Sequence, residues 1–223
     1  MCYCRLPRVA RIAVRIHNNK AREIAVSYQH ILYEVSDRIA TITLNRPDRM
    51  NAWTAIMERD VRHAMEAAAN DDHVRVIILT GAGRGFCAGA DLSSGANTFD
   101  RDARRGPVKR NADGSVDYSD PQVRDGGGQV TLRIFKCLKP VIAAVEGPAV
   151  AGGLELAIWC DLRVAASDAT FGVYCRRFGV PLMDLGTVRL PRLIGHSRAM
   201  DMILTGRDRK STRLNSSHCY ISR

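Results

Sequence analysis

Two short segments carry residues that could bind and stabilise a negatively charged oxygen. Residues 140–161 begin with an apolar, β-branched run, break at a Gly-Pro pair and continue through Gly152 into a helical pattern that holds one carboxylate, Glu155. A strand that leads into a helix opened by glycine leaves free backbone N–H groups at the positive end of the helix dipole. Such an end suits an anion, or an oxygen that becomes anionic during a reaction. Because Glu155 follows Gly152 by three residues, its side chain is expected near that oxygen.

The neighbours of Glu155 favour a chemical role for this carboxylate. It stands in the apolar run Leu154-Glu155-Leu156-Ala157-Ile158-Trp159. A carboxyl group in apolar surroundings has its pKa raised toward values that are useful for proton transfer. The segment therefore combines a backbone donor with a candidate general base.

A second segment, upstream of the first, also has a main chain that a ligand could approach. The apolar run over 74–79 predicts a buried strand, and the glycines over 81–85 predict a turn after it. The residues that follow have little side-chain bulk: Phe86-Cys87-Ala88-Gly89-Ala90-Asp91-Leu92. Small side chains let a ligand approach the main chain closely.

The elements around these segments indicate an α/β domain. Residues 31–35 and 38–44 alternate around a Ser-Asp pair, which predicts a hairpin. Apolar residues recur at helical spacing over 54–69, and shorter helical patterns cover 129–138 and 199–206. Two strands, a helix and a further strand therefore precede the first of the small-residue segments.

The charge of the chain belongs mainly to its ends. The net charge is +10, of which residues 1–30 carry +5 and residues 209–223 carry +4. The remaining residues, 31–208, are close to neutral, so we expect no nucleic acid partner, because such a footprint should lie on the folded surface as a patch. No stretch approaches eighteen uninterrupted apolar residues, and no membrane span is expected.

The seven cysteines form an odd set without C-x-x-C pairs. This pattern argues against a disulfide framework or a metal site and favours a reducing compartment, so the cytoplasm is the expected location. Arginines before Glu23 also fit a mitochondrial transit peptide, although few serines accompany them, and a poorly ordered extension is the alternative.

The two small-residue segments together resemble those of the crotonase (enoyl-CoA hydratase/isomerase) family. Residues 86–92 are similar to its first oxyanion-loop motif and residues 147–161 to its second, with supporting similarity over 45–52 and 186–195. The resemblance runs from about residue 31 to about residue 207. It implies a crotonase-like (ClpP/crotonase) superhelix of repeated ββα units, assembled as a homotrimer or a dimer of trimers.

The resemblance also implies the roles of individual residues. The N–H groups of Ala90 and Gly152 would hold the oxygen of a coenzyme A thioester, and Glu155 would activate water for attack on the β carbon. The main chain around these positions would contact the acyl-CoA substrate, at Ala52, Ala88, Ala90, Asp91, Leu92, Ser93 and Gly152. Asp91 has a simpler alternative role, as a turn-forming residue. Neither a metal nor a separate cofactor is expected, because coenzyme A is part of the substrate.

The chain departs from the family at the second catalytic glutamate. Cys175 occupies that position, four residues after Phe171. An ordinary thiol, with a pKa near 8.5, is a poorer acid or base than a tuned carboxyl. Arg176 and Arg177 could lower the pKa of this thiol, but a packed neutral thiol is the favoured interpretation. Asp184, on a loop where the family normally has glycines, is a second candidate for the missing acid.

The sequence divides into three parts. Residues 1–30 form a basic extension that we expect to be poorly ordered, residues 31–208 form the core domain, and residues 209–223 form a tail unlike the family. Family members continue into further helices, so we expect a chain truncated at its C-terminus, with a divergent native tail as the alternative. Within the core, the polar, glycine-rich residues 93–128 predict a flap near the thioester channel or a flexible insertion.

Three functions remain open at this point. The first is an enoyl-CoA hydratase-like lyase that adds or removes water across the α,β double bond, while an oxyanion hole stabilises the enolate. The second is other coenzyme A chemistry on the same fold. The third is a non-catalytic acyl-CoA-binding protein, which the replacement of the second glutamate by Cys175 makes reasonable.

Overall fold

A computed structural model describes most of the core and short pieces outside it, namely residues 27–99, 110–115, 117, 137–210 and 219–220. The strands are β1 (Ile31–Ser36), β2 (Ile39–Leu44), β3 (Val76–Gly81), β4 (Val141–Val145), β5 (Pro148–Val150), β6 (Leu162–Ala165), β7 (Thr170–Gly172), β8 (Asp208–Lys210) and β9 (Cys219–Tyr220). The α-helices are α1 (Ala55–Asn70), α4 (Gly152–Trp159), α5 (Gly186–Ile194) and α6 (His196–Thr205). The 3₁₀ segments are η1 (Pro47–Arg49), η2 (Leu92–Phe99) and η4 (Tyr174–Phe178).

The strands form two sheets. The larger has the order β1-β2-β3-β4-β6-β9 and the smaller the order β5-β7-β8. The predicted hairpin is present, with β1 antiparallel to β2, and its turn residues Asp37 and Arg38 have positive φ angles of 51° and 67°. Positive φ at both central positions matches the right-handed twist of the strands. From β2 to β6 the pairing is parallel, so the carboxyl ends of these strands share one edge.

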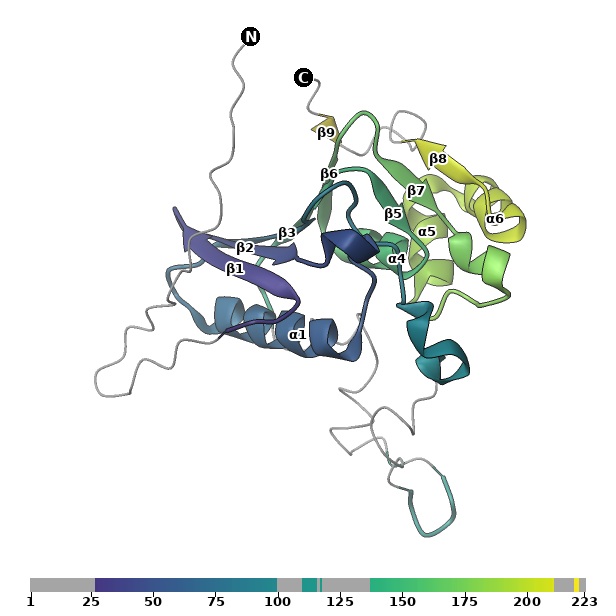
Figure 1. The fold of residues 1–223 in the computed structure, drawn as a ribbon, viewed down its shortest axis with the longest axis horizontal. Coiled ribbons are helices and arrows are strands. Elements are labelled where there is room, and N and C mark those ends of the chain that lie inside the picture. Colours follow the sequence, from purple (N-terminus) through teal and green to yellow (C-terminus); the bar gives the residue numbers. More distant parts are fainter. Residues whose placement is uncertain (1–26, 100–109, 116, 118–136, 211–218, 221–223) are drawn as a thin grey trace.

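The helix predicted over 54–69 is α1, which lies along one face of the first strands (Figure 1). Thr54 caps it by accepting the N–H of Met57 at 3.1 Å. Its buried side chains include Val61 and Met65, as the helical spacing predicted. The residues before β1 join the same helix, because the N–H groups of Gln29 and His30 both donate to Oδ2 of Asp60 at 2.9 Å.

The helix that begins at Gly152 is almost wholly buried. Every residue of α4 from Gly153 to Trp159 is buried. A short helix that is apolar all round belongs inside a domain, with other elements covering each side. Here α5 and β5 pack against it (Figure 1). Glu155 is therefore carried into the interior by its own helix.

Two sequence predictions differ from the structure at their edges, and a third is not tested. The strand expected over 74–79 is β3, at 76–81, because the Val74 N–H closes a turn onto the Asp71 carbonyl. The helix expected over 199–206 begins earlier, at His196. The helix expected over 129–138 lies outside the described residues, apart from positions 137 and 138.

The predicted extension, insertion and tail are described only in part. Residues 1–26 lie outside the description, as does most of the segment 93–128 beyond η2. In the predicted tail, β8 extends the smaller sheet beside β7 and β9 pairs with β6. The division into these parts stays a prediction.

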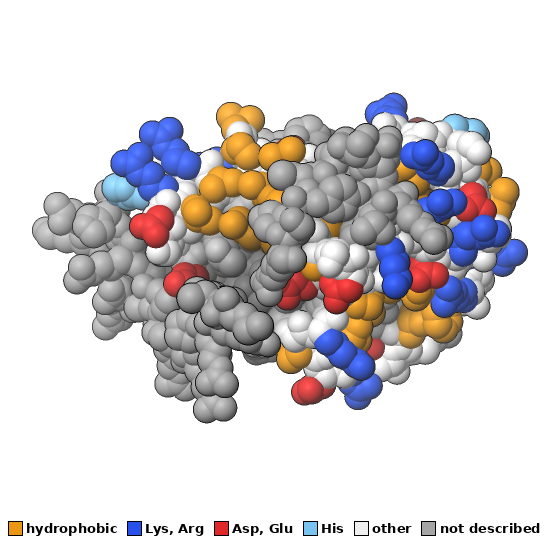
Figure 2. Space-filling view, turned by 90° about the horizontal axis from the view of Figure 1, so that it is seen from above, with side chains coloured by type: hydrophobic (Ala, Val, Ile, Leu, Met, Phe, Trp, Pro, Cys, Tyr) orange, Lys and Arg blue, Asp and Glu red, His pale blue; other side chains and the backbone are white. Residues whose placement is uncertain are grey.

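Acidic side chains lie among the basic ones over the α5–α6 end of the molecule (Figure 2). Asp201 on α6 pairs there with Arg207 and Arg209, at 3.4 and 2.8 Å. This mixing fits the near-neutral charge of residues 31–208. Among the described residues, each helix is too short or too polar to cross a membrane.

Candidate active site

The first small-residue segment is hydrogen-bonded to the turn that precedes α1. The Trp53 N–H donates to the Gly89 carbonyl at 2.7 Å, and the Asp91 N–H donates to the Trp53 carbonyl at 2.9 Å. These bonds form a parallel bridge between Trp53 and Ala90. Because successive N–H groups in an extended chain point to opposite sides, the N–H of Ala90 faces away from Trp53.

The second small-residue segment lies directly against the first. Cys87 bridges Ala149, and its carbonyl accepts the Val150 N–H at 3.0 Å. A methyl group on Gly89 would lie 2.9 Å from the nitrogen of Gly152, so these glycines are in close approach. Gly152 is the first residue of α4, and its N–H therefore has no acceptor within the helix. Ala90 and Gly152 are both partly exposed, whereas Gly89 and Gly153 beside them are buried.

Glu155 is buried and held by main-chain donors from a distant loop. Its side chain belongs to a residue that is only 3% exposed. Its Oε1 accepts the N–H of Asp184 at 2.9 Å and that of Gly186 at 2.7 Å. Burial, followed by the negative charge of Asp184, raises the pKa of Glu155 to about 7, although the backbone donors oppose the rise. The raised pKa expected from its apolar neighbours is confirmed.

The loop before α5 packs closely against the Glu155 carboxylate. A Cβ on Gly186 would lie 2.6 Å from Oε1 of Glu155, so only glycine allows this approach. Leu185 adopts the left-handed conformation, with φ 65°, immediately before the helix. The positive end of α5 thus points at Glu155. Sequence reasoning did not assign α5 or this contact, although Gly186 before an amphipathic pattern is the signal that could have indicated a helix start.

Cys175 and Asp184 both lie near Glu155. Burial, and then the charge of Glu155, raises the pKa of the Cys175 thiol. A backbone hydrogen bond from Arg176 lowers the pKa, but the net shift is upward, in agreement with the favoured interpretation of a packed neutral thiol. Both arginines are exposed, and the Arg177 guanidinium stacks 3.7 Å from the ring centre of Tyr174. Asp184, which is half-buried, contributes a backbone donor and a neighbouring charge to Glu155.

The remaining positions expected to contact the substrate are Ala52, Ala88, Leu92 and Ser93. Ala88 donates its N–H to the Met50 carbonyl at 2.9 Å, and Ala52 lies beside Trp53. Leu92 and Ser93 are exposed at the start of η2.

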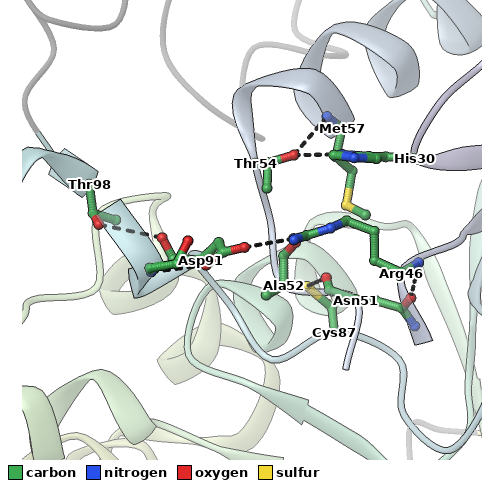
Figure 3. A network of polar contacts seen from close by, with 10 residues as sticks. His30, Arg46, Asn51, Ala52, Thr54, Met57, Cys87, Asp91 and Thr98 are labelled. Atoms are coloured by element: carbon green, nitrogen blue, oxygen red, sulfur yellow. Dashed lines mark hydrogen bonds and ion pairs between the residues drawn. The ribbon is translucent and has the colours of Figure 1, made fainter. Parts of the chain in front are cut away.

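The Asp91 carboxylate is occupied within the protein (Figure 3). Its Oδ1 accepts the Ser93 N–H at 3.0 Å, and its Oδ2 pairs with Arg46 at 2.8 Å. The turn-forming role considered for Asp91 is thus present in the structure. Sequence reasoning gave Arg46 no role, and nothing in the local pattern showed that it reaches residue 91.

The described part of the chain contains no group of three or more His, Cys, Asp or Glu side chains that could hold a metal ion. What the site offers is the main chain of two partly exposed residues, Ala90 and Gly152, and a buried carboxyl with a pKa of about 7. Such a set can stabilise an oxyanion and move a proton.

Comparisons with known proteins give one consistent result. A family model described as enoyl-CoA hydratase/isomerase matches residues 34–214. The "Probable enoyl-CoA hydratase EchA12" of Mycobacterium tuberculosis is 42% identical over 171 residues, which cover 76% of this chain and 56% of the relative. The (E)-benzylidenesuccinyl-CoA hydratase of Thauera aromatica is 36% identical over 177 residues, which cover 79% of this chain and 62% of that protein.

Solved structures agree with these sequence matches. The crystal structure of enoyl-CoA hydratase EchA1 from Mycobacterium marinum superposes with a TM-score of 0.66 at 37% identity, covering 83% of this chain and 65% of that one. This likeness confirms the crotonase-like fold class predicted from the sequence. The chain spans less than two thirds of the length of each of these relatives.

Proposed function

Because the chain belongs to the enoyl-CoA hydratase/isomerase family, we propose that it acts on acyl-CoA thioesters as an enoyl-CoA hydratase-like hydro-lyase. It adds water across the α,β double bond of an enoyl thioester, or removes water in the reverse direction. The observation that carries this proposal is Glu155. It is a buried carboxyl with a pKa of about 7, on the helix whose first amide lies beside the Ala88–Ala90 segment.

The main-chain donors account for binding and activation of the thioester. In the proposed mechanism, the amides of Ala90 and Gly152 donate to the thioester oxygen, which becomes negatively charged as the enolate forms. Donors fixed by the backbone do not have to reorganise during the reaction. Loss of one such donor typically costs about 3 kcal/mol in the transition state. The small residues at 88–90 leave room for the substrate to reach these amides.

Glu155 supplies the base. With a pKa near 7, a large fraction of Glu155 is ionised at neutral pH, and it can take a proton from water as the water oxygen bonds to the β carbon. The electrons of the double bond move to the thioester oxygen, forming the enolate. The α carbon then accepts a proton as the carbonyl reforms, so that one water molecule has been added.

Two side chains beside Glu155 are candidates for delivering the proton to the α carbon, Asp184 and Cys175. The raised pKa of the thiol keeps it protonated at neutral pH, where a thiol is a weak acid. Asp184 is ionised while its charge acts on Glu155, so it delivers a proton only after taking up the one that Glu155 removes from water; a carboxyl is then a stronger acid than the thiol. We therefore assign the α-proton to Asp184 ahead of Cys175.

Replacement of the second glutamate by Cys175 favours a second candidate function, in which the protein binds acyl-CoA without turning it over or performs other coenzyme A chemistry. Crotonyl-CoA separates these functions. Loss of the enoyl absorbance, abolished in Glu155→Gln, supports the hydratase. Tight binding without loss of absorbance supports the binding protein.

We also propose a homotrimer or dimer of trimers, in a reducing compartment such as the cytoplasm. The support for assembly is that several large apolar side chains from η4 to α5 are exposed, at Phe178, Met183, Leu185 and Val188. The support for the compartment is that, in the described part of the chain, Cys87, Cys137, Cys160 and Cys175 form no disulfide. Light scattering of the purified protein at micromolar concentration tests the assembly.

A further inference from the structure

We propose that Arg46 is a positioning residue for the Ala90 amide, acting through the Ala52 carbonyl and the Asp91 carboxylate. The inference rests on the proposed function, since it concerns how the thioester-binding amide is held in place. The guanidinium contacts of Arg46 are with Ala52 and Asp91, the neighbours of the residues in the Trp53–Ala90 bridge. Its effect is on the direction of a main-chain N–H.

Arg46 contacts both Ala52 and Asp91 (Figure 3). One guanidinium nitrogen, Nη1, lies 2.6 Å from the Ala52 carbonyl oxygen and 2.8 Å from Oδ2 of Asp91. Ala52 immediately precedes Trp53, and Asp91 immediately follows Ala90. The same nitrogen therefore links the two segments that the Trp53–Ala90 bridge pairs.

Arg46 is itself fixed at its base. Its backbone N–H donates to Oδ1 of Asn51 at 2.8 Å, and its carbonyl accepts the Asn51 N–H at 2.9 Å. Asn51 is completely buried, and its Nδ2 donates to the carbonyls of Ala82 and Gly85, at 2.9 and 2.8 Å. Asn51 thereby joins the turn that follows β2 to the turn that follows β3. Arg46 is therefore held at both ends, by its backbone at Asn51 and by its guanidinium at Ala52 and Asp91.

The partner carboxylate is equally constrained. Hydrogen bonds from Ser93, and then Arg46, lower the pKa of Asp91 to about 2, so it is ionised throughout the neutral range. The side chains of Arg46 and Asp91 are only 19% and 16% exposed. A hydrogen bond between ionised groups is shorter and stronger than one between neutral groups.

Removing Arg46 should release the segment that contains Ala90 without removing any group that meets substrate. Oxyanion donors work when they lie 2.7–3.1 Å from the developing charge, and a misplacement of about 1 Å can cost about 100-fold in rate. The two backbone bonds of the Trp53–Ala90 bridge would remain. The expected change is therefore a loss of kcat with little change in KM.

The experiment compares Arg46→Met, Arg46→Lys and Asp91→Asn with a matched control, Arg209→Met. Arg209 pairs with Asp201 at the same distance, 2.8 Å, but links α6 to β8. Asp91→Asn keeps the acceptor for the Ser93 N–H and removes the charge that faces Arg46. Each variant is assayed with crotonyl-CoA for kcat and KM, and its thermal unfolding is recorded.

A second readout reports on the donors directly. Crotonyl-CoA labelled with ¹³C at the thioester carbonyl is bound to the slow Glu155→Gln protein, and the carbonyl stretching frequency is measured by infrared difference spectroscopy. Well-placed donors lower this frequency. Adding Arg46→Met should reduce the downshift, whereas adding Arg209→Met should leave it unchanged.

We expect kcat to fall about 10- to 100-fold in Arg46→Met and Asp91→Asn, less in Arg46→Lys, and not in the control, with KM changing less than about threefold. Unchanged kcat and carbonyl frequency in folded Arg46→Met and Asp91→Asn would overturn the proposal. If Arg46→Met does not fold, kcat and the carbonyl frequency of Asp91→Asn decide whether the proposal holds. An unmodified protein that fails to hydrate crotonyl-CoA contradicts the proposed function instead, and the carbonyl frequency of the bound thioester then still tests Arg46.

Discussion

Gly186 donates its backbone N–H to Oε1 of Glu155 at 2.7 Å, so the first residue of α5 holds the carboxyl carried by α4. The sequence pattern predicts the position of Glu155 only from the helix that carries it. In the structure a loop 31 residues away decides where the carboxylate points and how readily it binds a proton.

Gly186→Ala should displace Glu155, because the added Cβ would lie 2.6 Å from Oε1. We expect kcat for crotonyl-CoA hydration to fall about 100-fold, as for other small misplacements of a catalytic group. Gly179→Ala is the control, since Gly179 has φ 68° and no atom within 4 Å of an added Cβ. The control should lose stability but keep kcat. Full activity in Gly186→Ala would show that the position of Glu155 is not critical.

The rate should depend on the ionisation of Glu155. A general base must be deprotonated, so kcat/KM should rise with pH and level off above an apparent pKa of about 7. Glu155→Gln should lose this limb and about 10²- to 10⁴-fold in kcat. The profile is measured with crotonyl-CoA between pH 5 and pH 9. A flat profile over this range would be incompatible with Glu155 as the base.

Asp184→Asn should move this pH limb to lower pH. Removal of the neighbouring negative charge lowers the pKa of Glu155, while the Asp184 N–H bond to Oε1 is retained because it belongs to the backbone. If Asp184 also delivers the α-proton, kcat falls at the plateau. Asp168→Asn, at an exposed position, should change neither quantity. A plateau rate equal to that of the unmodified protein removes Asp184 as the proton donor.

Ionisation of Glu155, which should raise the rate, should lower the stability of the folded protein. The folded pKa of Glu155, about 7, lies above its ordinary value of 4.5, so its contribution to stability is full below pH 4.5 and is lost as the pH rises through 7. Glu155→Gln should therefore gain stability relative to the unmodified protein between pH 5 and pH 8, by about 3 kcal/mol at most. Urea unfolding at both ends of this range measures the difference. A gain that is independent of pH would exclude this explanation.

Leu185 offers a test of backbone strain. Its φ of 65° lies in the left-handed region, where a residue with a Cβ costs about 1–2 kcal/mol. Leu185→Gly should be about 1 kcal/mol more stable than Leu185→Ala, which keeps the Cβ but loses the same leucine contacts. Denaturant midpoints of the two variants give the comparison. Equal midpoints would mean that the loop relaxes around the alanine.

Local patterns predicted the elements that depend on local physics. The alternation around Ser36 and Asp37 predicted the hairpin, and the apolar run around Glu155 predicted both its burial and its raised pKa. The spacing over 54–69 predicted α1 to within one residue at each end. For the hairpin and α1, the deciding interactions lie within a few positions of one another.

Contacts between distant segments could not be predicted from the sequence. The Glu155–Asp184 bond joins residues 29 positions apart, and the Arg46–Asp91 pair joins two turns separated by α1 and β3. Neither leaves a periodic signal. The thiol of Cys175 was given a possible charged neighbour from sequence proximity, whereas in the folded chain the nearer influence is the carboxyl of Glu155.

A crystal structure with acetoacetyl-CoA bound tests the central claim most directly. The account predicts that the thioester oxygen lies about 2.7–3.1 Å from the backbone nitrogens of both Ala90 and Gly152. The Glu155 carboxylate should then lie beside the β carbon. A thioester oxygen that contacts neither nitrogen, or only one of them, would contradict the account.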